Sequence, residues 1–158
     1  MSNTLKCTDL STVREVPGKI HEHNPEFRVF SKACPAFVPL IEEGIIDNEI
    51  MDLTIKYYLD DFIRDNKINS LVLGCTHYPL LKKHIHRLYP DVRIINSSLE
   101  VATAVEIELE KNNLFAEKRA GENVFYASDT SDNFMDMVKL ILGRDEEELN
   151  IRFKNLDI

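Results

Sequence analysis

The sequence predicts an α/β protein, with a parallel sheet and flanking helices, from three observations. Short apolar segments alternate along the chain with longer segments whose apolar residues recur at helical spacing. The short segments are rich in Val, Ile, Leu and Phe and end directly in small or polar residues, as buried parallel strands do. With 158 residues, 44% of them hydrophobic and 29% charged, the chain is long enough to bury a sizeable core.

These patterns place four strands and four helices on the sequence. The strands are expected at Phe27–Phe30, Ser70–Gly74, Val92–Asn96 and Asn123–Ala127. The helices are expected at Asn48–Asn66, Tyr78–Leu88, Leu99–Asn112 and Asp132–Leu142. Their alternation along the chain is typical of βαβ units around a parallel sheet.

The first of these helices carries two apolar stripes. One is Ile46, Ile50, Leu53 and Tyr57, and the other is Met51, Ile55, Tyr58 and Phe62. Two adjacent stripes at this spacing predict a helix with a broad buried face, for which Asp47 is a suitable amino-terminal cap.

The two ends of the chain give weaker patterns. Residues 1–24 show no convincing periodicity, and Pro17-Gly18 indicates a turn. The acidic run at 145–148 is expected to be a solvated tail or helix end.

The charge balance restricts the classes of partner. The chain has 27 acidic and 19 basic residues, a formal net charge of -8, so its field repels phosphate backbones and anionic membrane surfaces. We therefore expect neither nucleic-acid nor membrane binding. A small anionic ligand would have to be held locally, by backbone N–H groups and helix N-termini.

The three cysteines, Cys7, Cys34 and Cys75, fit neither a disulfide framework nor a paired zinc ribbon, because their number is odd and their spacing wide. Such usage favours a reducing cytoplasm. The first residues have no basic start followed by an apolar stretch, and no apolar run is long enough to span a membrane. We expect a cytoplasmic protein.

The segment most informative about chemistry is Leu71–Leu81. Its apolar strand stops at Gly74, and Cys75, Thr76 and His77 follow in a turn before a helix. A cysteine at a helix N-terminus is placed to be stabilised as a thiolate, and His77, two residues beyond Cys75, can share its proton. The alternative is a structural cysteine buried as a small hydrophobe. For Cys7 and Cys34 that alternative is favoured, whereas for Cys75 the context leaves the two readings evenly balanced.

A metal site is disfavoured by the spacing of its candidate ligands. It would use Cys75 and His77 with Cys34 or His84, and no standard zinc spacing relates these residues. His84 and His86 are expected at the surface, beside Lys82, Lys83 and Arg87 on a helix.

Two segments resemble one enzyme family. Gly74–Leu81, GCTHYPLL, is similar to the second catalytic-cysteine motif of glutamate racemases, and Lys32–Gly44 is similar to that family's ACPLFVPLVEEG segment. Val92–Ala104 and Phe125–Phe134 resemble later elements of the same family. The resemblance covers residues 25 to about 142.

This resemblance implies a cofactor-independent isomerase that interconverts L- and D-glutamate and so supplies D-glutamate for peptidoglycan, cell wall biogenesis and cell shape. In the family, one cysteine removes the α-proton and a second returns a proton to the opposite face. The resemblance implies that Cys75 is one of these bases, that His77 and Glu42 assist it, and that Thr76 binds substrate. It implies no metal and no cofactor. Without the resemblance, Glu42 would be interpreted as a solvated carboxylate at the end of a helix, and Thr76 as a helix cap.

The sequence also departs from the family. It lacks the DSGVGG-type loop and the CNTA-type loop with the first catalytic cysteine, for which Cys7 is not a convincing substitute. Asn96 stands where the family commonly has aspartate.

The family architecture suggests a plan for the domains. Residues 1–24 would be an atypical segment, 25–96 the second of two α/β domains, and 97–158 a returning segment of the first. Apolar faces on the last two helices would then be partly uncovered, which favours homo-oligomers.

Two other functions remain open at this stage. One is a non-catalytic glutamate-binding or interaction module derived from the same fold, which the absent first cysteine favours. The other is an aspartate racemase, because that enzyme shares the two-cysteine mechanism.

Overall fold

The computed structural model describes residues 3–7, 15–118, 121, 123–128, 131–143 and 149–155, and for 3–7, 15, 16 and 133 it describes the backbone alone. The chain divides into two compact units, Met1–Glu106 and Ile107–Ile158. Both contain parallel strands flanked by helices, which confirms the predicted α/β class. The family-based division at residues 24 and 96 stays a prediction.

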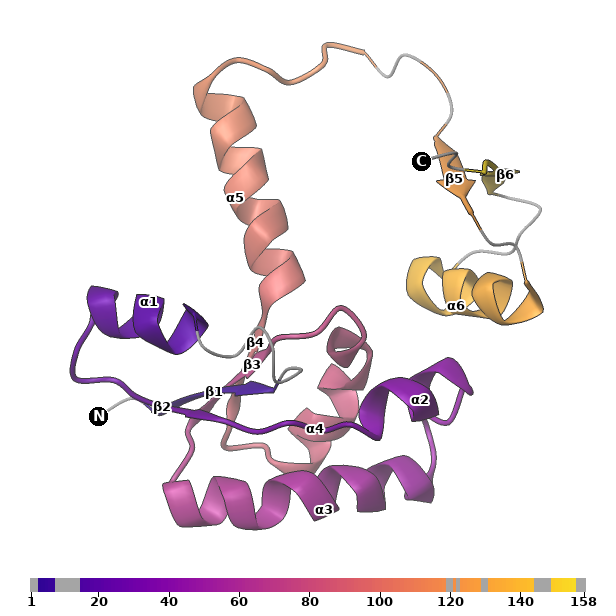
Figure 1. Ribbon diagram of the computed structural model, residues 1–158. Helices are drawn as coiled ribbons and strands as arrows, with labels where there is room; N and C mark the ends of the chain where they lie inside the picture. Colours follow the sequence, from indigo (N-terminus) through magenta and orange to yellow (C-terminus); the bar gives the residue numbers. More distant parts are fainter. Residues whose placement is uncertain are drawn as a thin grey trace. The chain divides into compact units, whose positions relative to one another are not determined.

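The first unit is built on a four-stranded sheet whose neighbouring strands all run parallel (Figure 1). In spatial order its strands are β2 (Arg28–Ser31), β1 (Asn3–Cys7), β3 (Ser70–Leu73) and β4 (Arg93–Asn96). The first strand in sequence therefore lies in the interior of the sheet.

The strand order creates a topological switch point between β1 and β3. From β1 the chain moves outward to β2, and it later crosses to the other side of β1 to form β3 and then β4. In open parallel sheets the connections diverge at such a point and leave a crevice outside the carboxyl ends of the strands, where ligands bind. The carboxyl ends of β1 and β3 are thus the expected location of a site.

Helices flank this sheet and supply most of its core. They are α1 (Glu15–His23), α2 (Phe37–Glu42), α3 (Glu49–Asn66), the 3-10 helix η1 (Tyr78–Leu81) and α4 (Lys82–Leu88). In Figure 1, α1 and α3 are drawn on opposite sides of the sheet. The side chains buried at less than 2% exposure are Cys34, Phe37, Ile41, Met51, Ile55, Leu59, Leu71, Leu73, Leu81 and Ile85.

The second unit contains a two-stranded parallel sheet, β5 (Val124–Ala127) and β6 (Asn150–Phe153), with α6 (Asp132–Leu142) between them in sequence. Helix α5 (Ser97–Lys111) spans the boundary between the units, and none of its residues is buried. Across the described ranges, no helix combines the length and the apolar character needed to cross a membrane.

The predicted elements match the structure closely from residue 27 onward. All four strands and all four helices are present within two residues of their expected bounds, although the helix expected at Tyr78 begins as the separate 3-10 turn η1. Before residue 27 the prediction was wrong, because residues 3–7 form a strand and Pro17-Gly18 lies inside α1. A proline in a first helical turn removes no helical hydrogen bond, so it does not end the helix. Strand β6 was also missed, and the acidic run at 145–148 lies outside the described residues.

Helix α3 corrects two further expectations. Its cap is Asn48, whose side chain accepts a hydrogen bond from the Met51 N–H at 3.1 Å, rather than Asp47. Of the two apolar stripes, one is buried at Met51 and Ile55 and half-buried at Tyr58 and Phe62. The other is exposed to solvent beyond its first member, Ile46. The buried face of α3 is therefore narrower than predicted.

Candidate active site

Cys75 follows the carboxyl end of β3, at the switch point of the sheet. The strand ends at Leu73, and Gly74 to His77 form the connection to η1, which begins at Tyr78. Cys75 is a half-buried free cysteine. The helix that follows this connection is the 3-10 helix η1, and four residues of it precede the α-helix α4.

His77 joins the other three predicted site residues through its two ring nitrogens. Its Nδ1 lies 3.9 Å from the Cys75 Sγ and 3.3 Å from the Thr76 Oγ1. Its Nε2 lies 3.3 Å from the Glu42 Oε1, which comes from the end of α2. The structure thus brings all four predicted residues together around one imidazole.

This geometry is compatible with a tautomer that suits proton transfer. If Nε2 carries the proton that faces the Glu42 carboxylate, Nδ1 is left as an acceptor for the thiol proton of Cys75. Transfer of that proton would leave a thiolate beside an imidazolium that faces Glu42, as in other cysteine–histidine pairs. The His77 and Glu42 side chains are 27% and 47% exposed, so water screens part of this attraction.

Buried aromatic side chains hold α2 and the Cys75 loop together. Phe37 and Ile41 anchor α2 in the core, which places Glu42 at its exposed end. The Tyr78 hydroxyl donates to the Cys34 carbonyl at 3.2 Å, and its ring meets the Phe37 ring edge-on at 5.4 Å. These contacts fix the segment before Glu42 relative to His77. Sequence reasoning missed both aromatics, although each lies within a segment that resembles the family.

The chain is similar to known proteins over most of its length. No family model matches it. The glutamate racemase of Persephonella marina is 44% identical over 124 residues, which cover 78% of this chain and 46% of that protein. The glutamate racemase of Aquifex aeolicus is 43% identical over 119 residues, covering 75% and 44%. The chain is homologous to the carboxyl-terminal part of glutamate racemases. It spans about half the length of these curated relatives.

Solved glutamate racemases share the fold. The structure from Francisella tularensis, solved with D-glutamate, superposes with a TM-score of 0.86 at 30% identity, covering 99% of this chain and 59% of that one. The structure from Thermus thermophilus, solved with β-chloro-D-alanine, gives a TM-score of 0.76 at 27% identity, covering 99% and 57%. The likeness therefore extends to β1 and α1, which the sequence alone did not connect to glutamate racemases.

Asn96, expected as a departure from the glutamate racemase pattern, has a local structural role. Its side-chain oxygen accepts a hydrogen bond from the Ser98 N–H at 3.1 Å, at the start of α5. The Ser97 hydroxyl donates to the Leu73 carbonyl at 2.9 Å and ties the end of β4 to the end of β3. An aspartate at position 96 could accept the same bond, because both side chains offer an oxygen there.

The other cysteines and His84 confirm some expectations and correct others. Cys34 is buried as predicted, but it is disulfide-bonded, which the odd cysteine count did not predict. Cys7 ends β1 with its backbone opposite Leu73, and its side chain lies outside the described part of the chain. The His84 side chain is only 12% exposed, so its expected surface position was wrong. Across the residues that the structure describes, no group of three or more His, Cys, Asp and Glu side chains could hold a metal ion.

Proposed function

We propose that this chain carries the carboxyl-terminal part of a glutamate racemase and supplies one of the two bases that act on the α-carbon of glutamate. The observation that supports this most strongly is the line from Glu42 through His77 to Cys75. These three residues lie near the carboxyl ends of the strands, at the switch point of the sheet, in a chain homologous to glutamate racemases.

In this proposal Cys75 exchanges a proton with one face of the substrate. His77 accepts the thiol proton at Nδ1 while Glu42 stabilises the resulting imidazolium, and the thiolate removes the α-proton. The proton then resides on the Cys75 sulfur, and the electron pair of the broken C–H bond is left on the substrate. Thr76 is exposed beside the thiol and binds substrate.

Inversion needs a second base on the opposite face, because a single base returns the proton to the side that it left. In relatives of twice this length the other half of the protein is available to supply that base. We propose that a CNTA-type cysteine loop from such a half completes the site, and that the complete enzyme uses no cofactor. In the cell it would work in the cytoplasm and provide D-glutamate for peptidoglycan.

Glutamate is favoured over aspartate as the substrate. The Francisella tularensis protein, whose fold this chain shares almost throughout, was solved with D-glutamate. A non-catalytic glutamate-binding module is the second candidate, supported by the lack of a CNTA-type motif in this sequence.

The experiment is α-proton exchange of L- and D-glutamate in deuterated water, with the purified chain alone and with the amino-terminal half of the Aquifex aeolicus racemase added. We expect exchange of one enantiomer by the chain alone, or racemisation once the other half is present. Cys75→Ser should abolish either signal. Cys75→Ala should keep the thermal stability of the parent chain, because a half-exposed thiol contributes little to packing.

Replacement of His77 tests its role in proton transfer. His77→Gln should slow exchange by roughly a hundredfold or more, as expected for loss of a group that transfers protons. If folded protein shows no Cys75-dependent exchange with or without the added half, the racemase proposal fails and the binding module remains.

A further inference from the structure

The carbonyl oxygen of Cys34 accepts hydrogen bonds from the two segments that form the candidate site. The Phe37 N–H, at the start of α2, donates to this oxygen at 3.1 Å. The Tyr78 hydroxyl, at the start of η1, donates to it at 3.2 Å across 44 positions of sequence. One backbone oxygen therefore joins the helix that ends at Glu42 to the residue that follows His77.

Helix α2 depends on this oxygen for its orientation. The helix has six residues, about 9 Å in length, and so short a helix is not stable without packing. Its N-cap residue, Ala36, forms no side-chain hydrogen bond to the first turn, and the Phe37 N–H is instead satisfied by the Cys34 carbonyl. Because a short helix moves as one unit, a shift at its start also displaces Glu42 at its end.

Tyr78 is itself held firmly beside His77. It is 4% exposed, and its ring meets the Phe37 ring edge-on at 5.4 Å. The backbone of His77 is held in the same turn, because its carbonyl accepts the Leu80 N–H at 3.1 Å. Tyr78 therefore contacts the start of α2 while its neighbour His77 contacts the end of α2, where Nε2 lies 3.3 Å from the Glu42 Oε1.

We propose that Tyr78 is a positioning residue whose hydroxyl keeps the Glu42 carboxylate beside His77. In this way it controls the reactivity of the Cys75 thiol. A carboxylate at this position favours the imidazolium, and the imidazolium favours the thiolate. Without the hydroxyl, α2 is less restrained, the carboxylate spends less time beside the imidazole, and the thiolate forms less readily. The role of Tyr78 in catalysis rests on the proposed function, whereas its effect on the thiol does not.

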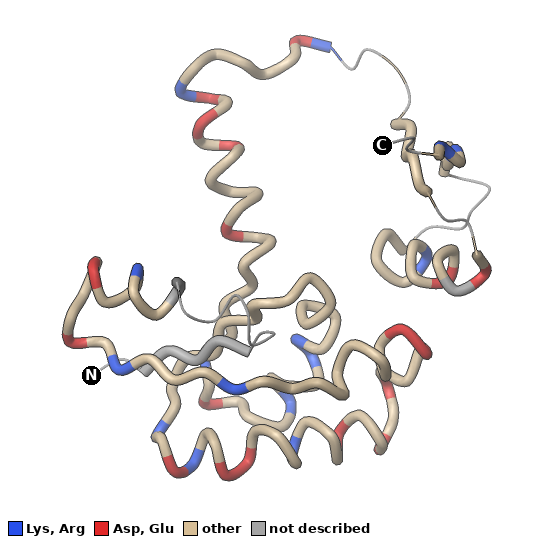
Figure 2. Tube along the Cα trace, viewed as in Figure 1, with Lys and Arg blue, Asp and Glu red and all other residues tan. Residues whose placement is uncertain are grey.

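A second carboxylate at the end of α2 provides a control for charge. Glu42 and Glu43 are adjacent and both exposed, and they belong to the acidic segment that follows α2 in Figure 2. Both contribute to the local negative field, which water and salt screen. The contact with His77 is made by Glu42. An effect of contact should therefore be lost in Glu42→Gln and kept in Glu43→Gln.

Alkylation of Cys75 by iodoacetamide measures the thiolate in the purified chain without glutamate. Near neutral pH, Tyr78→Phe should slow this reaction by roughly fivefold. In alkaline solution, where any thiol ionises, the rates of parent and variant should converge. A variant that merely blocked access to the thiol would react slowly at every pH. Mass spectrometry of the peptide that contains Cys75 follows the reaction at each pH.

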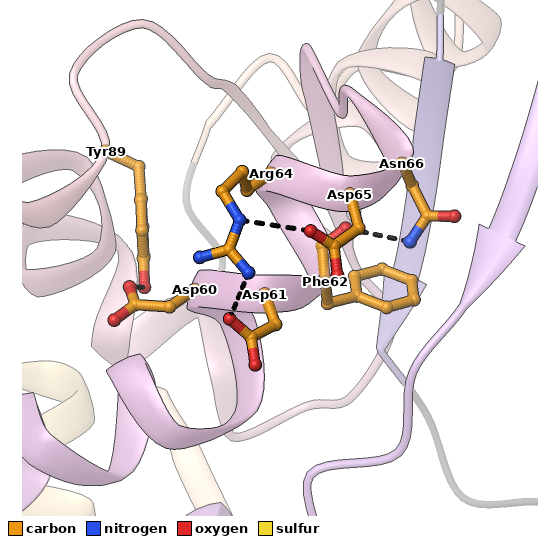
Figure 3. Close-up of polar contacts among 7 residues, drawn as sticks. All are labelled: Asp60, Asp61, Phe62, Arg64, Asp65, Asn66 and Tyr89. Atoms are coloured by element: carbon orange, nitrogen blue, oxygen red, sulfur yellow. Dashed lines mark hydrogen bonds and ion pairs between the residues drawn. The ribbon is translucent and has the colours of Figure 1, made fainter.

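The Tyr78→Phe variant should fold, because the Cys34 carbonyl keeps its bond from the Phe37 N–H and is not left without a donor. Circular dichroism verifies this. Tyr89→Phe is the matched control, since it removes another tyrosine hydroxyl bond of the first unit, to Asp60 at 2.6 Å (Figure 3). That bond joins the residue after α4 to α3, so alkylation should stay within about twofold of the parent rate. Equal slowing in both variants would overturn the proposal.

A double variant tests whether Tyr78 acts through Glu42. Glu42→Gln should slow alkylation at neutral pH at least as much as Tyr78→Phe. Combining the two changes should slow it by less than about twofold beyond Glu42→Gln alone, because the carboxylate to be positioned is already absent. Effects that multiply in the double variant would overturn the proposal, as would a Tyr78→Phe variant with the alkylation profile of the parent.

α-Proton exchange separates this inference from the racemase proposal. With the amino-terminal half of the Aquifex aeolicus racemase added, Tyr78→Phe should slow exchange by a factor similar to that for alkylation. If alkylation responds as expected and no Cys75-dependent exchange occurs, the positioning role stands and the racemase proposal fails. If exchange occurs and Tyr78→Phe alters neither reaction, the racemase proposal stands and the positioning role is overturned.

Discussion

The two units of this chain use the same kinds of elements and bury very different amounts of apolar surface. In the first unit, the core residues lie between Cys34 and Val92, on strands and helices that cover one another. In the described part of the second unit, large apolar side chains stay exposed, including Tyr126 at 62%, Ile141 at 59% and Phe153 at 62%. Similar apolar patterns therefore produced a core in one unit and open surface in the other.

Periodicity therefore identifies helices and strands, but it does not show whether another layer of structure covers their apolar faces. Parallel sheets are normally buried on both faces, and two strands alone rarely form a stable sheet. The first unit has four strands with helices on both sides, whereas β5 and β6 form a sheet of two. The second unit is the part of the chain whose stability should depend most on additional protein.

Hydrogen exchange should show the largest contrast between the units. Amides of β3 and α3 should exchange more than about a thousandfold more slowly than those of β5 and β6, because core elements open only with global unfolding. Exchange followed by mass spectrometry of peptides measures both units in one sample. Equal protection of the two sheets would show that the two units do not differ in local stability.

Leucine truncation compares the units at matched positions in two α-helices. Leu59→Ala, at 1% exposure on α3, should lower the free energy of unfolding by about 2–5 kcal/mol. Leu140→Ala, at 45% exposure on α6, should cost less than about 1 kcal/mol. Urea denaturation followed by circular dichroism measures both changes, and similar costs would mean that α6 is covered in solution.

Removal of the α3 cap should have an intermediate effect that is confined to the first unit. Asn48→Ala removes the acceptor of the Met51 N–H and should cost about 1 kcal/mol. Asn48→Asp keeps an acceptor and serves as the control. Peptide-resolved hydrogen exchange should show faster exchange in α3 with β5 and β6 unchanged; faster exchange in both units would indicate that they unfold together.

The smallest effect is expected at alkaline pH, from the contact between Tyr89 and Asp60. Burial, together with the hydrogen bond to Asp60, raises the pKa of Tyr89 above its usual range. The stabilisation is therefore fully present below about pH 10, where tyrosine in an unfolded chain ionises, and is lost as the pH rises towards the folded-state pKa. Thermal unfolding at increasing pH should show a steeper decline for the parent chain than for Tyr89→Phe. If thermal stability declined equally with pH in both proteins, the contact between Tyr89 and Asp60 would not be a source of stability in the first unit.

The sequence predicted the fold well wherever strands were rich in branched apolar residues. Strands β2 to β5 were found on that basis, whereas β1, with the sequence NTLKC, lacks such a run and was missed. The meeting of Cys75, Thr76 and His77 follows from their adjacency, and Glu42 joined them only through family resemblance. The aromatic contacts around Tyr78 depend on tertiary packing, which no local pattern encodes. The exposed stripe on α3 was misread because spacing shows that a face is apolar, not what covers it.

The interior position of β1 has a consequence for how the chain folds as it is synthesised. Leu5 lies opposite both Phe30 and Leu71, so β1, which is synthesised before β2 and β3, acquires its second neighbour only after β3 has emerged from the ribosome. Until then β1 and β2 form an incomplete pair with an open edge, a state prone to mispairing. Completion of the sheet requires closure of a long loop, which slows folding. The arrival of the segment that carries Cys75 therefore also commits the sheet to its native order.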